Sequence, residues 1–385
     1  MASGKMRVAI IFGGKSGEHE VSLASARSVM AAIDKSRYEI FPVGITKSGQ
    51  WLTTGDPLAL LSAGEDVTPE GGQDALVASG GQALIPIDCK AKQSLPRRRD
   101  LVPGMRKARF PVVDVVFPVL HGTYGEDGTI QGLLELADLP YVGAGVLGSA
   151  LGLDKVAMKS VFRANDLPMV DYMLVMRKVW AARPVQVLEE IGARFTYPIF
   201  LKPANLGSSV GVSKAHQREE LIRGLDLAAR FDRKILVEAA VNAREIECSV
   251  LGNDDPIASV PGEVVPSNEF YDYKAKYIDN ASELRIPADL PAETVKLVQE
   301  LAVRAFVALD CAGMARVDFF LCRDTGKVYV NELNTIPGFT CISMYPKLWE
   351  ASGIPYSELI DRLIELALER YNDKHASETT YSFDH

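Results

Sequence analysis

Residues 315–343 read ARVDFFLCRDTGKVYVNELNTIPGFTCIS, and this stretch predicts a β-hairpin. Residues of the kind that favour strands fill Ala315–Cys322 and Lys327–Asn334. Between them, residues 323–326 read RDTG, a sequence typical of a tight turn. We therefore expect two neighbouring antiparallel strands here, and the rest of the chain is interpreted around them.

Four polar side chains of this hairpin are expected on one face, because alternate residues of a strand point the same way. If the two strands pair symmetrically about the turn, Asp318 lies opposite Glu332. In the same register Arg316 lies opposite Asn334. Two carboxylates, an amide and a guanidinium would then share one patch.

This patch has two interpretations. Hard oxygen ligands suit Mg²⁺, which proteins usually hold with one or two carboxylates plus substrate phosphates. Two acids facing each other across a ladder also need a neutralising partner. The alternative is a solvated polar face with a surface ion pair, which is common and contributes little to stability. The hairpin alone favours the solvated face, so other segments must decide.

Composition narrows the function classes. A chain of 385 residues is expected to form two or three domains, and its 47% hydrophobic and 24% charged residues are ordinary for a soluble protein. The net charge of −8 argues against general binding to nucleic acid or anionic membranes. No apolar run is long enough to span a membrane, and no signal peptide is evident. Five widely spaced cysteines suit neither a disulfide framework nor a zinc site, so we expect a cytoplasmic protein.

The N-terminal third predicts a parallel α/β domain up to about residue 145. Met6–Phe12 and Asp114–Leu120 are apolar strand candidates, each followed by a glycine-containing turn and a helical pattern. Ligands of such sheets bind at the carboxyl ends of the strands, where Glu18 and His121 fall. Residues 53–107 are rich in Gly, Pro and polar residues and predict an irregular insertion.

The middle of the chain carries two lysines on separate elements. Lys155 lies on a predicted helix, and Lys202 ends a predicted strand just before the Gly/Ser-rich loop 203–211. Such a loop can direct N–H groups and hydroxyls at phosphate oxygens, although a surface hairpin is an equal alternative. Farther on, Glu238 ends a strand and Glu245 begins one.

A long polar and aromatic loop is predicted at residues 263–284. A loop of this length is usually a functional lid or a disordered segment, and its aromatic residues argue against simple disorder.

Together the two lysines, the Gly/Ser loop, the strand-end acids and the acid–amide face resemble the ATP-grasp superfamily. Six segments in order narrow the resemblance to the D-alanine–D-alanine ligase family, and they extend the similarity from about residue 6 to 371. These segments are GGKSGEHEVS (13–22), HGTYGEDG (121–128), KPANLGSSVG (202–211), YDYKAKY (271–277), ARVDFF (315–320) and NELNTIPGFT (331–340). With this resemblance the solvated-face interpretation of the hairpin is no longer favoured.

The resemblance implies an α/β (α+β) chain with an ATP-grasp fold, in which two α+β domains enclose ATP. It places a Rossmann-like substrate domain at residues 1–145, a central ATP-grasp domain at 146–240 and a C-terminal ATP-grasp domain at 241–372. The last domain would contain the metal site and the lid 263–284, and residues 373–385 would form a tail.

The implied activity is ATP-dependent joining of two D-alanines through a D-alanyl phosphate, with release of ADP and phosphate, for peptidoglycan precursors in the bacterial cytoplasm. The resemblance also implies a homodimer. Alternatives are a ligase that uses D-lactate or D-serine as the second substrate, or another ATP-grasp carboxylate–amine ligase. The aromatic lid sequence YDYKAKY resembles the dipeptide-forming members, and GEHEVS argues against the more distant ligases.

The resemblance also assigns roles to residues of the ATP and metal sites. Asp318, Glu332 and Asn334 would hold two Mg²⁺ or Mn²⁺ ions. Arg316 and the Gly338 N–H would stabilise the transferring phosphoryl group and the oxyanion. The residues implied in ATP binding are Lys155, Lys202, Ser208, Ser209, Glu238, Ala239, Val241, Glu245, Lys276, Asn331 and Glu332.

For the amino-acid substrates, the family residue matching Glu18 pairs with the first D-alanine's ammonium, with His121 close by. Ser208 and Tyr277 would hydrogen-bond to Glu18, and Ser343 with the Met344 backbone would receive the second D-alanine's carboxylate. Three points stay open in this assignment. His121 could only orient a loop, Glu247 could be a structural residue, and Ala239 stands where many members have lysine.

Overall fold

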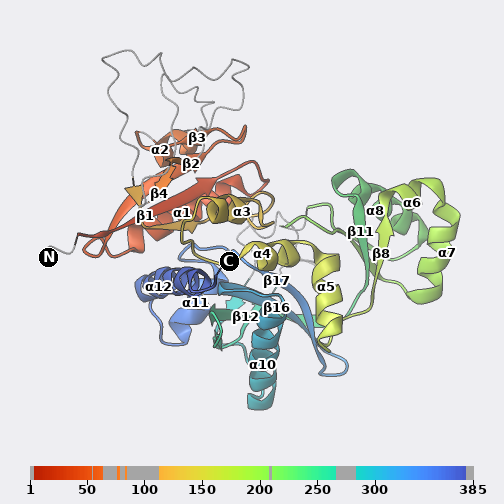
Figure 1. Cartoon of the computed structure of the whole chain (residues 1–385). Coiled ribbons are helices and arrows are strands. Elements are labelled where there is room, and N and C mark those ends of the chain that lie inside the picture. The colour runs from red at the N-terminus through yellow and green to blue at the C-terminus, as the bar shows by residue number, and fades with distance from the viewer. Residues whose placement is uncertain are drawn as a thin grey trace, which may run out of the picture.

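The computed structural model describes residues 4–53, 55–63, 76–78, 83–84, 112–207, 210–265 and 283–378. There are three larger sheets, each with its own helices; in Figure 1 the N-terminal sheet lies above the C-terminal sheet, and the central sheet stands to the right. No helix in these described ranges is both long and apolar enough to cross a membrane.

The N-terminal sheet has the strand order β3-β2-β1-β7, and β1 runs parallel to both β2 and β7. This confirms the predicted parallel sheet, with α1 and α3 as its helices. The bounds are β1 Met6–Gly13, α1 His19–Ala32, β2 Tyr38–Ile45, β3 Trp51–Leu52, β7 Val115–Pro118 and α3 Thr129–Leu136. Gly13 has a φ of +89°, and a Cβ there would lie 2.2 Å from the Ile45 carbonyl oxygen, so the turn after β1 requires glycine.

The expectation of an irregular insertion at 53–107 is wrong for part of that segment. Pro57–Ser62 forms helix α2, with Pro57 in its first turn. The carboxylate of Asp56 accepts a hydrogen bond from the Ala59 N–H and caps this helix. A small separate sheet joins β4 (Leu76–Ala78), β5 (Ala83–Leu84) and β6 (Val112–Val113), and the rest of the insertion lies outside the described residues.

The central sheet is antiparallel, with the order β10-β9-β11-β8. Its core lies between the strands and helices α6, α7 and α8, which stand at the right of Figure 1. The bounds are β8 Tyr172–Met176, α6 Arg177–Ala182, α7 Pro184–Arg194, β9 Ile199–Pro203, β10 Ser213–Ala215, α8 Arg218–Phe231 and β11 Lys234–Ala239. The opposite face of β9 and β11 carries Lys202 and Glu238.

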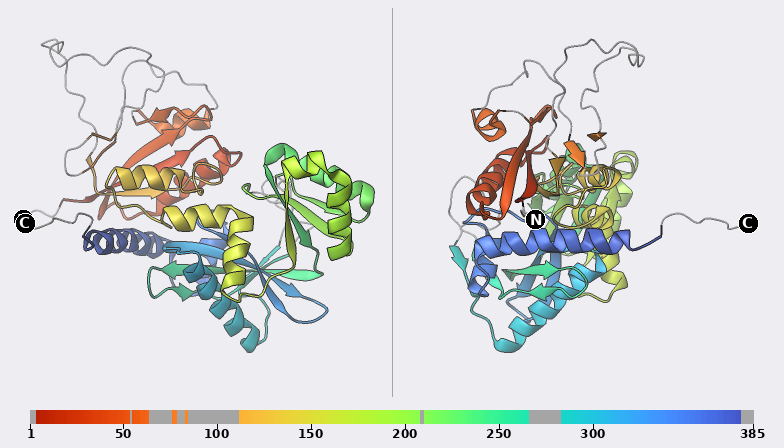
Figure 2. Two further views of the ribbon diagram at one scale, coloured as in Figure 1. Left: turned by 45° about the vertical axis from the view of Figure 1, so that its right-hand side comes forward. Right: turned by 60° about the vertical axis from the view of Figure 1, so that its left-hand side comes forward.

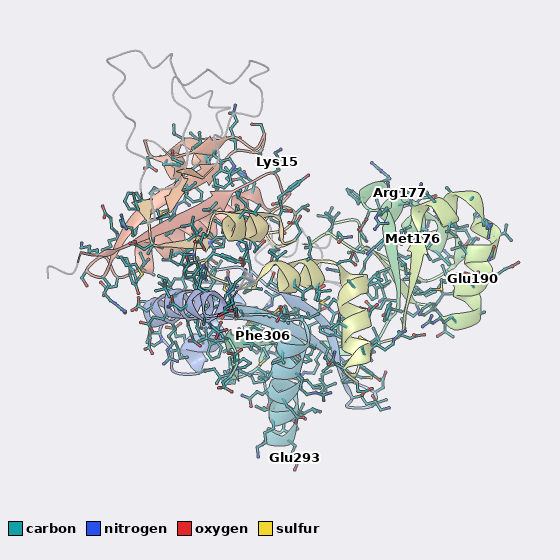
Figure 3. The ribbon with its side chains drawn as sticks, in the orientation of Figure 1. Lys15, Met176, Arg177, Glu190, Glu293 and Phe306 are labelled. Atoms are coloured by element: carbon teal, nitrogen blue, oxygen red, sulfur yellow. The ribbon has the colours of Figure 1, made fainter. Side chains whose placement is uncertain are left out.

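The C-terminal sheet has the order β15-β14-β12-β16-β17, and β13 pairs with β12. Helix α10 packs on one face; Figure 3 shows Phe306 where α10 meets the sheet and Glu293 at its free end. The bounds are β12 Ala243–Gly252, β13 Ile257–Ala258, β14 Gly262–Val265, β15 Glu283–Arg285, α10 Ala292–Ala308, β16 Gly313–Cys322 and β17 Val328–Asn334.

Several helices pack outside the sheet with which the sequence groups them. α4 (Val146–Leu153) and α5 (Lys155–Ala164) contact the C-terminal strand β17, and Met158 and Phe162 join the core of that sheet. α12 (Tyr356–His375) lies between the N-terminal and C-terminal units (Figure 2) and shares a core with β1 and α1. The domain limits at 145 and 240 stay a prediction.

The C-terminal helices differ from expectation in two places. α11 (Met344–Ala351) was not predicted. α12 extends to His375, so the predicted start of the tail at residue 373 is too early in the sequence. Its last turn is fixed by the ion pairs of Lys374 with Glu135 and of His375 with Asp138.

The hairpin register around the polar patch is confirmed. Asp318 pairs with Glu332, and Arg316 pairs with Asn334. A register shift follows between Asp318 and Phe319, where Asn331 is the extra residue of β17. Because this bulge lies on the turn side of the acidic pair, the four polar side chains still share one patch.

Candidate active site

A cavity of about 650 Å³ lies between the central and C-terminal sheets and reaches the loops after β1 and β7. Most of the predicted site residues that the structure describes line it: Glu18, His121, Lys155, Lys202, Glu238, Ala239, Val241, Glu245, Arg316, Asp318, Asn331, Glu332, Asn334 and Gly338. Ser343 and Met344 lie outside its lining. Ser208, Ser209, Lys276 and Tyr277 lie outside the described residues.

The carboxylate of Asp318 is held by two neighbours on the hairpin. Arg316 donates from Nε and Nη2 to its two oxygens at 2.7 and 2.8 Å. The Asn334 amide donates to Oδ2 at 3.0 Å. The carboxylate opposite, Glu332, forms an ion pair with Lys155 at 3.0 Å. Each acid of the pair therefore has its own cation, which removes the repulsion expected between facing carboxylates.

These side chains fit a Mg²⁺ site in their chemistry. Asp318, Glu332 and Asn334 present hard oxygen atoms to the cavity, next to the two lysines expected to bind phosphates. Among the described residues, no group of three or more His, Cys, Asp or Glu side chains forms a ready-made metal site.

Arg316 has a second acidic partner that the sequence did not identify. Its Nε lies 3.0 Å from Glu247 Oε2, on the adjacent strand β12. Burial lowers the pKa of the guanidinium, but the charges of Asp318 and Glu247 outweigh this effect and raise that pKa well above its usual value. Glu247 thus helps to orient the Arg316 guanidinium and stabilises its positive charge.

Glu238 is held by two lysines. Its Oε2 lies 2.7 Å from Lys202 Nζ, and its Oε1 lies 2.6 Å from Lys159 Nζ. Burial by itself would raise the pKa of Glu238, but the two ammonium groups outweigh it and hold that pKa at about 2. A contact of Glu238 with adenine remains a prediction.

The carboxylate of Glu18 meets two glycine loops from different parts of the chain. A Cβ on Gly122 would lie 2.7 Å from Glu18 Oε2, and a Cβ on Gly207 would lie 2.9 Å from it. The loop after β7 and the Gly/Ser loop after β9 therefore both approach Glu18 closely, and the φ of +74° at Gly122 also favours glycine at that position. Gly207 directly precedes Ser208, the predicted hydrogen-bond partner of Glu18.

Both ring nitrogens of His121 are used inside the protein. Nδ1 lies 2.9 Å from the Ile336 carbonyl oxygen and Nε2 lies 2.9 Å from Ser25 Oγ. Burial lowers the pKa of His121, so the neutral ring donates from Nδ1 and accepts at Nε2. This geometry favours the alternative in which His121 orients the loop that carries Gly338.

Glu126 also binds the loop that carries Gly338, and the sequence did not identify this residue. Its Oε1 accepts from the Ile336 N–H at 2.9 Å, and its Oε2 accepts from the Gly122 N–H at 2.6 Å. Glu126 and His121 together bind both the N–H and the C=O of Ile336. Burial raises the pKa of Glu126 most, the negative charge of Glu18 raises it further, and the resulting pKa is about 8.

We predict a pH signature for Glu126. The carboxyl pKa is raised from its ordinary value of 4.5 to about 8 in the folded chain, so its contribution to stability is complete below pH 4.5 and is lost as the pH rises toward 8. Glu126→Gln removes this titration. Its free energy of unfolding, relative to the parent protein, should therefore rise by roughly 1.4 kcal/mol per pH unit across that window. Urea unfolding from pH 5 to 8 measures it. Parallel curves for the two proteins would exclude this role.

Ser343 lies beside Gly338, since a Cβ on Gly338 would be 3.1 Å from Ser343 Oγ. The Ser343 hydroxyl accepts from the Thr340 N–H at 3.1 Å. The Met344 side chain is buried against Val264 and Leu348 at the start of α11, and a contact of its backbone with substrate stays a prediction.

Three residues of this site were missed: Lys159, Glu126 and Glu247 as a partner of Arg316. Lys159 stands one helical turn after Lys155, and this i, i+4 spacing on a helix was the available signal. Glu126 lies within the quoted segment HGTYGEDG. Their partners are distant in sequence, so the contacts themselves leave no local signal.

Comparison with known proteins identifies the fold. A solved structure of a D-alanine–D-alanine ligase from Coxiella burnetii matches 97% of this chain and 97% of its own, with a TM-score of 0.77 and 35% identity. The VanG D-Ala:D-Ser ligase from Enterococcus faecalis matches 94% of this chain and all of its own, with a TM-score of 0.76 and 36% identity. The fold is thus the ATP-grasp fold of these ligases, as predicted.

The sequence matches are closer. The family described as D-ala D-ala ligase N-terminus matches residues 7–144, and that described as D-ala D-ala ligase C-terminus matches residues 161–365. D-alanine–D-alanine ligases from Acetivibrio thermocellus and Ruminiclostridium cellulolyticum are 52% and 55% identical over 373 residues, which is 96% of this chain and 97% of each relative. The chain belongs to the D-alanine–D-alanine ligase family.

Proposed function

We propose that this enzyme joins two D-alanine molecules into D-alanyl-D-alanine, converting one ATP into ADP and phosphate. The observation that carries the proposal is the facing pair Asp318 and Glu332 on the wall of a cavity that also contains Lys155 and Lys202. Two carboxylates beside two lysines suit the Mg²⁺–phosphate part of ATP. Glu18, at the carboxyl end of β1 on the same cavity, suits an ammonium group.

In the first step, a carboxylate oxygen of the first D-alanine attacks the γ-phosphorus of ATP. A bond forms between that oxygen and phosphorus, and the bond from phosphorus to the β-phosphate oxygen breaks, giving D-alanyl phosphate and ADP. Lys155 and Lys202 bind the phosphates, and Lys276 is proposed to contact the γ-phosphate. Asp318, Glu332 and Asn334 would hold two Mg²⁺ ions, which neutralise charge on the transferring group.

In the second step, the amine of the second D-alanine attacks the acyl carbon. The tetrahedral intermediate then loses phosphate, breaking the carbon–oxygen bond, and the proton that leaves the new amide nitrogen passes to the departing phosphate. Arg316, which Asp318 and Glu247 hold in one orientation, would stabilise the oxyanion. The Gly338 N–H has no acceptor among the described residues and lines the cavity, which suits the same task.

The substrate contacts are proposals of the same kind. Glu18 pairs with the ammonium of the first D-alanine, and Ser208 and Tyr277 hydrogen-bond to Glu18. Ser343 and the backbone of Met344 receive the carboxylate of the second D-alanine. Glu245 binds the ribose, and Ala239 and Val241 lie beside the adenine. We further propose that the enzyme acts as a cytoplasmic homodimer in peptidoglycan precursor synthesis.

A second candidate function uses D-serine as the second substrate. One observation supports it: this structure is as similar to the D-Ala:D-Ser ligase as to the D-Ala–D-Ala ligase, so structural similarity does not separate the two substrates. The two curated relatives with about half of their residues identical favour D-alanine.

Phosphate release separates these functions. The purified enzyme with ATP and Mg²⁺ should release phosphate with D-alanine alone and form the dipeptide in equal amount. D-serine or D-lactate added as a competing second substrate should yield a minor product. A mixed product that dominates at equal substrate concentrations would favour the second function, and no turnover with D-alanine alone would exclude the main one.

A further inference from the structure

Lys159 is a buried cation that the reaction outlined above does not use. It lies on α5, one turn after Lys155, and its side chain is 1% exposed. It does not line the cavity, so it does not reach a bound nucleotide directly. Its Nζ contacts Glu238 Oε1 at 2.6 Å and donates to the Asn331 carbonyl oxygen at 3.1 Å. Asn331 is the extra residue of the β17 bulge, next to Glu332.

Glu238 forms ion pairs with two lysines, and only one of these side chains is exposed to the cavity. Lys202 Nζ lies 2.7 Å from Glu238 Oε2, its side chain is 12% exposed, and it lines the cavity. Glu238 itself is 1% exposed and sits on β11, beside β9, which carries Lys202. Of the two lysines that hold this carboxylate, Lys202 can turn toward a ligand and Lys159 cannot.

The buried Glu238 carboxylate needs a positively charged partner at all times. If Lys202 alone held Glu238, its movement toward a phosphate would leave a buried, unpaired carboxylate, which is strongly unfavourable. Nucleotide binding would then have to overcome that loss. With Lys159 in place, Glu238 keeps a close ammonium partner whichever way Lys202 points.

We propose that Lys159 is a positioning residue that keeps Glu238 paired, so that Lys202 is free to turn from Glu238 to the phosphates of a bound nucleotide. The inference rests on the nucleotide-binding part of the proposed function. It does not depend on which amino acids are joined. The competing explanation is that Lys159 only supports the packing of α5 against β17 through the Asn331 carbonyl.

The test is the affinity for ADP with Mg²⁺, measured by calorimetry in the absence of D-alanine. Four proteins form a cycle: the parent, Lys159→Met, Glu238→Gln and the double variant. Lys178→Met, an exposed lysine on α6, is the matched control and should bind as the parent does. Lys159→Met should weaken ADP binding roughly 5- to 150-fold, the usual size of a coupling between sites.

The Glu238→Gln background separates the two explanations. A neutral amide needs no balancing cation, so Lys159→Met should then change ADP affinity by only about twofold. An equal loss in both backgrounds would mean that Lys159 acts through packing and would overturn the proposal, as would parental affinity in Lys159→Met. If Lys159→Met alone does not fold, the comparison of Glu238→Gln with the double variant decides: a change in ADP affinity of about twofold supports the proposal, and a loss of roughly fivefold or more overturns it.

Failure of this inference is distinguishable from failure of the proposed function. A parent protein that binds no ADP overturns both. A parent that binds ADP and follows the expected cycle, but forms no dipeptide, supports the role of Lys159 and removes the proposed ligation.

Discussion

Replacing Asp318 or Glu332 by alanine is expected to lower kcat by about 1,000-fold or more at saturating ATP. Metal ions contribute several kcal/mol to transition states of this kind, and each 1.36 kcal/mol corresponds to about tenfold in rate. The structure places these carboxylates opposite each other on the cavity wall, where we propose that both bind the ions that accompany the phosphates. Removing either one leaves part of the negative charge on the transferring group without a cation.

The fold is expected to survive both substitutions. Arg316 keeps Glu247 when Asp318 is removed, and Lys155 stands at the open cavity when Glu332 is removed. Asp324→Ala, in the exposed turn of the same hairpin, is the matched control and should keep parental activity. The measurements are Mg²⁺-dependent phosphate release and circular dichroism. Near-parental turnover of either active-site variant would show that the hairpin does not hold the metal.

Arg316→Lys is expected to lower kcat by roughly 100- to 1,000-fold, the usual effect of losing one oxyanion-stabilising donor. Lysine keeps the positive charge but has no planar fork, and so it cannot bind both oxygens of Asp318 while also contacting Glu247. The variant therefore keeps a positive charge in the cavity, but this charge is no longer held in one orientation. The loss should fall on kcat, with a smaller change in the KM for ATP.

Steady-state kinetics with D-alanine and ATP measure this separation of kcat from KM. Arg285→Lys is the control, because Arg285 also forms a two-pronged contact with an acid, Glu283, but on the exposed strand β15. A variant with parental kcat and a raised KM for ATP would assign Arg316 to nucleotide binding in place of oxyanion stabilisation.

The acidic hairpin could be predicted because its signals are local. Strand alternation and a short turn are sufficient to place Asp318 opposite Glu332, and the structure has this pairing. The bulge at Asn331 has no such signal in the residue types around it. The bulge leaves the site undisturbed because it falls on the turn side of the acidic pair.

Other features were missed although a signal was present. Helix α2 begins with the capping residue Asp56 and Pro57, a typical helix start within a segment that otherwise suggested irregular structure. Helix α7 likewise begins at Pro184 and buries Val187, Leu188 and Ile191 at helical spacing.

The contacts within the site could not be predicted in the same way, because they join distant segments. Lys159 and Asn331 are separated by 172 positions, and Glu126 and Ile336 by 210. Only the folded chain brings these groups together. The resemblance to the ligase family named the residues that are predicted to contact substrates, whereas the buried residues that orient them became visible only in the structure.

The most direct test of the central claim is the fate of the oxygen atoms of D-alanine. The enzyme is supplied with ATP, Mg²⁺ and D-alanine whose carboxylate carries a heavy oxygen isotope, and the released phosphate is analysed by mass spectrometry. If the carboxylate is phosphorylated and phosphate then leaves the acyl carbon, every phosphate released with the dipeptide carries one labelled oxygen. Dipeptide formation with unlabelled phosphate would contradict the account.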